Sequence, residues 1–136
     1  MEKGFDYAPI WKRIVAYLLD YAIVWGILAA VLFKYGAPTE DGTYEVSGWP
    51  ALLPIAFWLF YIVFIEYKFG ATLGHQVVKL KVVQEHGLPL RFVDVLKRRI
   101  VDPLDHMFVA IILIKNTPNR QRIGDIVAKT VVVKDI

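Results

Sequence analysis

Two long apolar runs constrain this chain more than any other feature. Residues 14–33 carry a single charge, Asp20, and residues 46–65 carry none. A helix rises about 1.5 Å per residue, so about 20 residues cross the roughly 30 Å hydrocarbon core of a bilayer. The chain is 57% hydrophobic with a mean hydropathy of +0.46, whereas soluble domains average about 45–50% apolar residues. The sequence therefore predicts a membrane protein with helical spans at about 14–33 and 48–67.

A secretory signal peptide is the competing interpretation of the first run, because Lys12 and Arg13 precede it. The apolar region of a signal peptide is about 7–15 residues long, and an aspartate at its centre is unexpected. The run here is longer and contains Asp20. We therefore expect a retained membrane span.

Basic residues are distributed unevenly around the two runs. Lys and Arg number three in residues 1–13, seven in residues 66–99 and five in residues 115–136, but one in residues 34–45, beside three acids. Cytoplasmic segments of membrane proteins carry the excess of Lys and Arg. We therefore expect a multi-pass membrane protein with its N-terminus, residues 66–99 and its tail in the cytoplasm.

A third apolar segment, residues 100–114, is short for a span and contains Asp102 and Asp105 in its first half. The stretch before it is amphipathic, with one apolar stripe among basic residues, a pattern suited to a membrane surface. A full crossing would place the basic tail outside, against the charge rule. We expect one helix, at about 91–114, that lies in the interface or re-enters the membrane.

A soluble β element is predicted between the second span and this helix. Val78, Leu80 and Val82 alternate with Lys79 and Lys81, which is the period of a strand. A return strand is expected near 88–90, and the β-rich tail at 129–134 is expected to pair with the element at about 76–91. The predicted fold is a single domain, 1–136, mainly α, with two transmembrane helices, a third amphipathic or re-entrant helix and a small cytoplasmic antiparallel β element.

Several charged residues lie in or beside the predicted membrane segments. Asp20 is inside the first run, and Arg13 is seven positions earlier, at its start. A charge at the bilayer centre costs about 2.5–3.5 kcal/mol on insertion scales and is a candidate for function. The set is either a buried network that fastens the helices together or part of an ion or proton pathway. The expected partners of Arg13 are Asp102 and Asp105. Those of Asp20 are Arg98 and Arg99.

Enzymes and nucleic-acid-binding proteins have little support. The chain has no cysteine, no phosphate loop, no dinucleotide fingerprint and no nucleophile–base pair. Asp102, Asp105 and His106 form Asp-x-x-Asp-His, but no second histidine stands at ligand spacing. We expect no enzyme, no cofactor and no metal site. The basic cluster of residues 97–99, beside a membrane, favours anionic lipid headgroups over nucleic acid as partner.

The order of these motifs resembles the RDD family of small bacterial membrane proteins. That family is named for one arginine and two aspartates, which would be Arg13, Asp20 and Asp125 here. Gly70-Ala-Thr-Leu-Gly and Leu80-Lys-Val-Val resemble its Gly-x-(Ser/Thr)-(Leu/Ile)-Gly-Lys and Leu-(Arg/Lys)-Val-Val signatures, with His75 where a lysine is usual. The resemblance covers about residues 8–134.

The resemblance implies a protein of the bacterial inner membrane with two membrane segments and a role in the transport of ligands that are not known. In some relatives the implied activity is exchange of sodium for protons. A desolvated aspartate can bind a proton, and Na⁺ can compete for the same oxygens. Two or three helices hardly enclose a pathway alone, so transport implies a homo-oligomer or another membrane protein as partner. The first hypothesis is a small ion-coupled transporter that exchanges cations for protons. The alternative is a non-transporting adaptor or accessory subunit that binds or stabilises another membrane complex.

Overall fold

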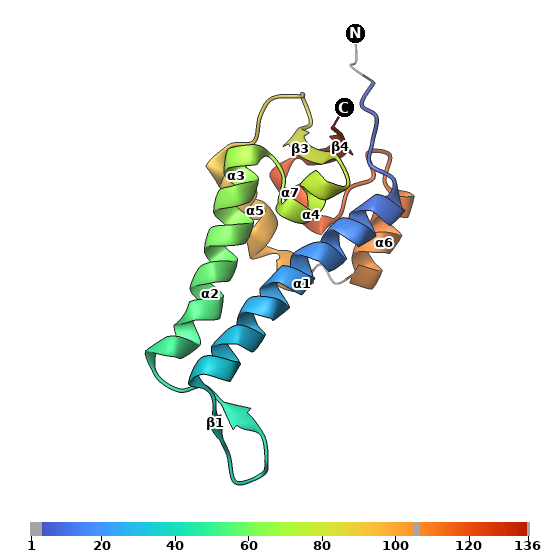
Figure 1. The fold of residues 1–136 in the computed structure, drawn as a ribbon. Helices are drawn as coiled ribbons and strands as arrows, with labels where there is room; N and C mark the ends of the chain where they lie inside the picture. Colours follow the sequence, from blue (N-terminus) through green and yellow to red (C-terminus); the bar gives the residue numbers. More distant parts are fainter. Residues whose placement is uncertain (1–3, 105–106, 136) are drawn as a thin grey trace.

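Two long helices dominate the computed structural model, which describes residues 4–104 and 107–135 (Figure 1). The first is α1, Ile10–Tyr35, and the second runs over Trp49–Phe69. Both are long and apolar enough to cross a membrane, and 17% and 28% of their most apolar stretches are buried inside the molecule. A helix that is apolar on its exposed surface is typical of a membrane span. Each helix is longer than the apolar run that predicted it.

The second long helix changes its winding along its length. Pro50 and Pro54 stand in the first turns of its first two segments, where a missing backbone N–H costs no helical hydrogen bond. Its π-helical segment buries Tyr61, Ile62 and Val63, and π-helical turns are frequent at functional sites. The four segments are η1 (Trp49–Leu52), α2 (Leu53–Trp58), η2 (Leu59–Ile65) and α3 (Glu66–Phe69).

A short hairpin connects the two long helices. Strands β1 (Ala37–Pro38) and β2 (Tyr44–Glu45) pair antiparallel, and the Asp41 carboxylate accepts hydrogen bonds from Thr43 in the turn between them. Figure 1 shows this hairpin at the opposite end of the long helices from both chain ends. The hairpin and the rest of the chain therefore lie at opposite ends of the two candidate spans.

Residues 70–135 form a compact unit at that other end, here named the cap. Its strands β3 and β4 pair antiparallel, with Leu80 opposite Lys134 and Gln84 opposite Thr130. The N-terminal segment joins the sheet, because Tyr7 bridges to Val133. The elements of the cap are α4 (Leu73–Val77), β3 (Leu80–Gln84), α5 (Phe92–Ile100), η3 (Asp102–Leu104), α6 (Met107–Asn116), α7 (Ile123–Ala128) and β4 (Thr130–Lys134).

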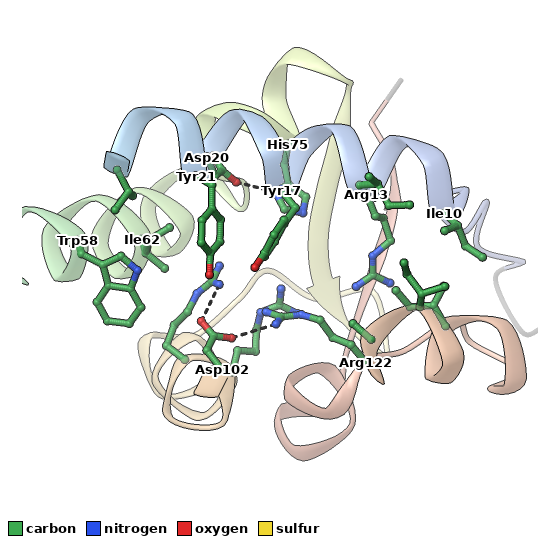
Figure 2. Close-up of a pocket in the computed structure, with 17 residues that line it drawn as sticks. Ile10, Arg13, Tyr17, Asp20, Tyr21, Trp58, Ile62, His75, Asp102 and Arg122 are labelled. Atoms are coloured by element: carbon green, nitrogen blue, oxygen red, sulfur yellow. Dashed lines mark hydrogen bonds and ion pairs between the residues drawn. The ribbon is translucent and has the colours of Figure 1, made fainter. Parts of the chain in front are cut away.

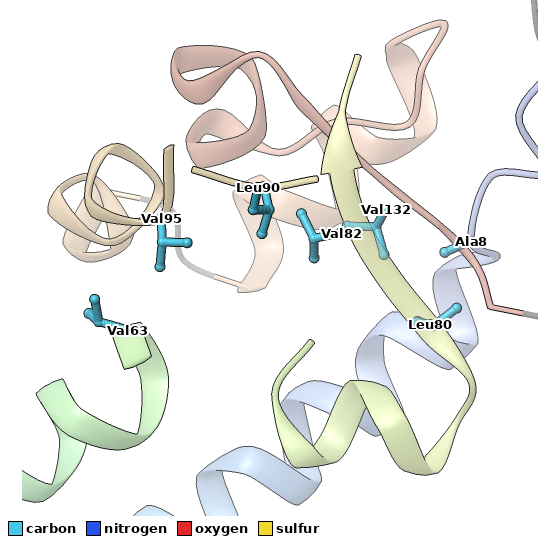
Figure 3. Packing of buried hydrophobic residues seen from close by; sticks show 7 residues of the cluster. All are labelled: Ala8, Val63, Leu80, Val82, Leu90, Val95 and Val132. Atoms are coloured by element: carbon cyan, nitrogen blue, oxygen red, sulfur yellow. The ribbon is translucent and has the colours of Figure 1, made fainter. Parts of the chain in front are cut away.

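The main apolar core lies where the cap meets the long helices (Figure 3). It contains residues from the N-terminal segment, η2, both cap strands and α5, so the core is shared between cap and spans. Burying such side chains stabilises each by about 1.5–3 kcal/mol. The members are Ala8, Val63, Leu80, Val82, Leu90, Val95 and Val132.

A mainly helical chain with two apolar helices and a small antiparallel sheet is confirmed, but two expected elements differ. Instead of one helix over 91–114, the chain forms α5 and α6 with η3 between them, because Pro103 has no N–H with which to continue the helical ladder. The ten residues of α6 extend only about 15 Å. Residues 88–90 form no strand, whereas the tail strand β4 pairs with β3, as the sequence predicted.

Candidate functional site

Asp20 connects three elements through one carboxylate. Tyr61 in η2 donates its hydroxyl hydrogen to Oδ1 at 2.8 Å, and the backbone N–H of Gly74 donates to the same oxygen at 2.9 Å. Thr72 donates to Oδ2 at 2.5 Å, and Nδ1 of His75 lies 3.5 Å from that oxygen. A charge-assisted set of donors of this kind stabilises the ionised carboxylate. Asp20 thus holds α1, the second long helix and α4 together.

Gly74 is the residue that allows α4 to lie so close to α1. A Cβ atom at this position would stand 2.2 Å from the carbonyl oxygen of Ala16 and 2.8 Å from Oδ1 of Asp20. Any side chain would therefore push α4 away and separate the donors from the Asp20 carboxylate.

His75 and Asp20 form a buried imidazole–carboxylate contact, here named the Asp20–His75 pair. Burial lowers the pKa of His75, and this effect outweighs the opposing influence of Asp20 and Glu66. The imidazole is therefore neutral at pH 7. Thr72 Oγ1 lies 2.8 Å from Nδ1, so the ring is fixed beside the carboxylate.

Asp125 is the centre of a second charged cluster. One carboxylate oxygen lies 2.7 Å from Nη2 of Arg13, and the other is bound by Arg98. The backbone N–H of Arg122 donates to Asp125 at 3.2 Å, which caps the start of α7. Burial alone would raise the pKa of this carboxyl, but the charges of Arg98, Arg13 and Arg122 outweigh it and hold the pKa far below its usual range. The carboxylate therefore remains ionised although it is completely buried.

The cluster continues as an alternating chain of cations and anions. Arg98 also approaches Glu66, with Nη2 and Oε1 separated by 3.1 Å, and Arg99 binds the other oxygen of Glu66. Asp102 lies 3.1 Å from Arg99 and 2.9 Å from Arg122. Breaking a buried ion pair leaves an uncompensated charge, so such a network fastens the elements that contribute to it. This arginine network consists of Arg13, Asp125, Arg98, Glu66, Arg99, Asp102 and Arg122.

The structure arranges the predicted residues in two groups rather than one. Asp20 belongs to the pair with His75, whereas five others belong to the arginine network: Arg13, Asp125, Arg98, Arg99 and Asp102. Two expected pairings differ in the structure. Arg13 pairs with Asp125 rather than with Asp102, and Asp20 is bound by α4 and η2 rather than by Arg98 or Arg99. The physical reason is that α4 packs against α1 at Asp20, so its donors are the nearer ones.

Asp105 and His106 lie outside the described residues. Among residues 4–104 and 107–135, no group of three or more His, Asp or Glu side chains could hold a metal ion.

Sequence reasoning missed five residues of the site: Tyr61, Glu66, Thr72, His75 and Arg122. One signal was available, since Glu66 is the first charge after the uncharged second run. An acid at the end of a span, followed by many basic residues, predicts an ion pair but not which arginine makes it. Thr72 and His75 lie in the motif at residues 70–75, which could have drawn attention to them, whereas the roles of Tyr61 and Arg122 depend on which elements pack together.

A cavity of about 390 Å³ lies between α1, the second long helix and the cap (Figure 2). Tyr17 and Tyr21 point from α1 across it, toward Asp102 and Arg122. Apolar side chains of α1, the second long helix and α6 form its walls: Ile10, Ile14, Val24, Trp58, Ile62, Ala110, Ile111 and Ile114. Charged or titratable side chains line the rest: Arg13, Asp20, His75, Arg98, Arg99, Asp102 and Arg122. The two charged groups therefore meet at one amphipathic cavity.

Comparison with known proteins identifies the family of this chain. Residues 7–129 match the RDD family. The chain is 30% identical over 135 residues to the uncharacterized membrane protein YteJ of Bacillus subtilis (strain 168), covering 95% of this chain and 82% of that protein. No solved structure is significantly similar. With its two apolar helices, the chain is therefore a membrane protein of the RDD family.

Proposed function

We propose that this RDD protein is a small proton-coupled transport unit of the bacterial inner membrane. The observation that carries the proposal is the Asp20–His75 pair, in which a carboxylate of a candidate span contacts an imidazole at the wall of a cavity. Ionisable residues inside membrane segments are rare and mark ion paths and proton relays. In this proposal the pair binds and releases the coupling proton.

Proton binding at the pair changes the force between two elements. With His75 neutral and Asp20 ionised, the pair carries one negative charge, which a proton on His75 cancels. The groups facing the pair are Tyr61, Thr72 and Glu66 together with Arg98. Because α4 is held on α1 mainly through this carboxylate and Gly74, the protonation state biases the position of α4 and with it the cavity wall.

The lining of the cavity supports an anion, rather than a metal cation, as the coupled solute. Among the described lining residues, four are arginines and two are aspartates. Guanidinium groups attract anions and repel cations at short range. The proposal therefore departs from the cation/proton exchange that the family resemblance implies. Most of both long helices is exposed, so a pathway requires a homo-oligomer or a second membrane protein.

The test measures proton movement in proteoliposomes with a pH-sensitive dye. Gradients of Na⁺, K⁺, inorganic phosphate and a short alkyl phosphate are imposed in turn. We expect proton movement with at least one of the two phosphates, reduced at least tenfold in Asp20→Asn and His75→Gln. The matched control is Asp41→Asn, whose carboxylate is exposed in the β1–β2 turn, and it should behave as wild type.

Two outcomes would overturn parts of the proposal. Proton movement driven by Na⁺ or K⁺ alone would show that the coupled solute is a cation, and would support cation/proton exchange instead. No proton movement from correctly inserted wild-type protein would remove transport altogether. The Asp20 contacts would then serve only to fasten the helices, and the adaptor hypothesis would take precedence.

A further inference from the structure

We propose that the cavity is a binding site for an anionic lipid, with the phosphate headgroup on the arginines and an acyl chain along the apolar wall. This inference goes beyond the transport proposal and does not depend on it, because a bound lipid could equally be a structural ligand of an adaptor. Three features of the cavity support it: the arginines in its lining, a hydrogen-bond donor of Arg98 that has no acceptor among the described residues, and apolar walls along the candidate spans.

The cavity presents the cationic side of the arginine network. Four arginines and two aspartates line it, whereas two further carboxylates of the network, Glu66 and Asp125, are completely buried and do not line it. A ligand in the cavity therefore meets guanidinium groups before it meets those acids. Guanidinium presents its donors in a planar fork that matches a phosphate, so clustered arginines favour this anion.

Arg98 supplies a second, independent observation. Its side chain is 1% exposed, and its Nε has no hydrogen-bond partner among the described residues. A buried donor left without an acceptor costs about 1–3 kcal/mol. Because Arg98 lines the cavity, a phosphate oxygen in the cavity is a suitable acceptor.

The apolar walls continue the cavity along the candidate spans. Trp58 and Ile62 lie on the second long helix at the opposite end of the cavity from Arg13 (Figure 2), and Val24 lies near the middle of α1. A volume of about 390 Å³ is within the range of about 300–1,000 Å³ for small-molecule sites. It accommodates a phosphate and the first methylenes of a chain, whose remainder follows the exposed faces of the helices.

The depth of the arginines agrees with a lipid headgroup. Arg13 stands in the first turn of α1, so it lies near the membrane surface if α1 spans the bilayer. By the charge rule this is the cytoplasmic surface, where anionic headgroups attract basic clusters. A lipid-borne phosphate would therefore reach the arginines while its chain remains in the hydrocarbon layer.

Trp58 provides a direct probe, because it is one of four tryptophans and the other three are exposed. In a variant with Trp11, Trp25 and Trp49 replaced by Phe, its fluorescence is measured in uncharged detergent. Phosphatidate with brominated chains, the phosphatidylcholine with the same chains, and inorganic phosphate are titrated separately. We expect saturable quenching by brominated phosphatidate, at least tenfold tighter than by the phosphatidylcholine, and no displacement by equimolar inorganic phosphate.

Two substitutions in this background separate the site from a general charge effect. Arg122→Gln removes a cation from the lining and should weaken phosphatidate binding about tenfold, whereas Lys12→Gln removes a cation that does not line the cavity and should change it less than twofold. Asp20→Asn should still bind lipid, and a wild-type protein that binds lipid but moves no protons would reject only the transport proposal.

Equal quenching by the two lipids, or an equal effect of the two substitutions, would overturn the lipid site. Displacement by equimolar inorganic phosphate would assign the arginines to free phosphate instead of a lipid.

Discussion

At the scale of single residues, Gly74 decides whether α4 can contact α1. Gly74→Ala would place a methyl group 2.2 Å from the carbonyl oxygen of Ala16, and overpacking of this kind costs about 1–3 kcal/mol. Gly26→Ala is the matched control, because nothing lies within 4 Å of a Cβ there and alanine favours a helix by about 1 kcal/mol. Thermal unfolding in detergent should show Gly74→Ala below wild type and Gly26→Ala at or above it. An unchanged melting temperature for Gly74→Ala would contradict the close packing.

Asp125 is the residue whose loss should destabilise the protein most. Asp125→Asn leaves Arg13 and Arg98 without their shared carboxylate, and breaking a buried ion pair costs about 3–5 kcal/mol. The control is Asp6→Asn. The Asp6 side chain is 64% exposed and pairs with Lys134, so this substitution should lower the free energy of unfolding by less than about 1 kcal/mol. Denaturant unfolding followed by tryptophan fluorescence compares the two. Similar free energies of unfolding would show that the network is not fastening the cap.

His75 should make stability depend on pH in a defined range. Burial holds its folded-state pKa below the ordinary value of 6.5, so the unfolded chain binds more protons as the pH falls below about 6.5. Stability is therefore complete above pH 6.5 and decreases as the pH falls toward the folded pKa. The pKa of the Asp125 carboxyl is lowered in the folded protein, so this group reduces stability only below about pH 3.8, where the unfolded chain begins to bind the proton.

Melting temperatures between pH 7.5 and 5 measure this effect. We expect wild type to lose stability toward pH 5 and His75→Gln to lose less. His86→Gln, in the exposed turn after β3, should follow wild type. A slope in His75→Gln equal to that of wild type would assign the pH dependence to other groups.

The sequence identified which residues to consider but not how they pair. Asp20 and Arg13 stand out because a charge in an apolar run is unusual, and that signal requires no structure. Their partners could not be predicted, because pairing depends on the packing of α4 against α1 and on a turn at Asp102. Thr72 and His75 belong to the motif at residues 70–75 that resembles a family signature, but that motif does not show that they contact Asp20, which depends on the close approach of Gly74 to α1.

At the scale of elements, the orientation of the two long helices is directly testable. The chain has no cysteine, so each introduced cysteine is the only one. Glu40→Cys lies in the hairpin, and His86→Cys and Asp135→Cys lie in the cap, all at exposed positions. Because basic segments remain cytoplasmic, a membrane-impermeant maleimide should label only Glu40→Cys in intact cells and all three after permeabilisation. Labelling of Asp135→Cys in intact cells would mean that the tail crosses the membrane.

The sequence predicted the helices and strands whose pattern of apolar and polar residues is long and regular. The two long helices follow from apolar runs of span length, and β3 follows from its alternation of valine or leucine with lysine. The region after Ile100 did not, because a short apolar run with acids and a proline fits a re-entrant helix and a broken one equally well. The pairing of β3 with β4, about 50 positions apart, was also predicted, because the chain has a second β-rich run in its tail and a lone hairpin is marginal in water.

At the scale of the whole molecule, the cap and the long helices form one cooperative unit. Ion pairs cross between them at Arg13 and Glu66, Asp20 accepts a hydrogen bond from the Gly74 N–H, and the apolar core includes Ala8 and Val63 from outside the cap. The N-terminal segment also donates the Ala8 N–H to the carbonyl of Val132 in β4. The cap therefore lacks a complete core and a balanced charge set without the long helices.

This leads to a prediction for the isolated cap, residues 70–136. Alone, it keeps Arg98, Arg99 and Asp125 but loses Arg13 and Glu66, and a sheet of two strands is marginal in water without further packing. We expect no cooperative thermal transition by circular dichroism for this fragment. When it is coexpressed with residues 1–69 in membranes, the fragment should co-purify with them and regain a cooperative transition. Asp125→Asn should weaken this association. The control Lys81→Gln, at an exposed position of β3, should not. A cooperative transition in the isolated fragment would mean that the cap is an independent domain and that the arginine network joins two bodies rather than completing one.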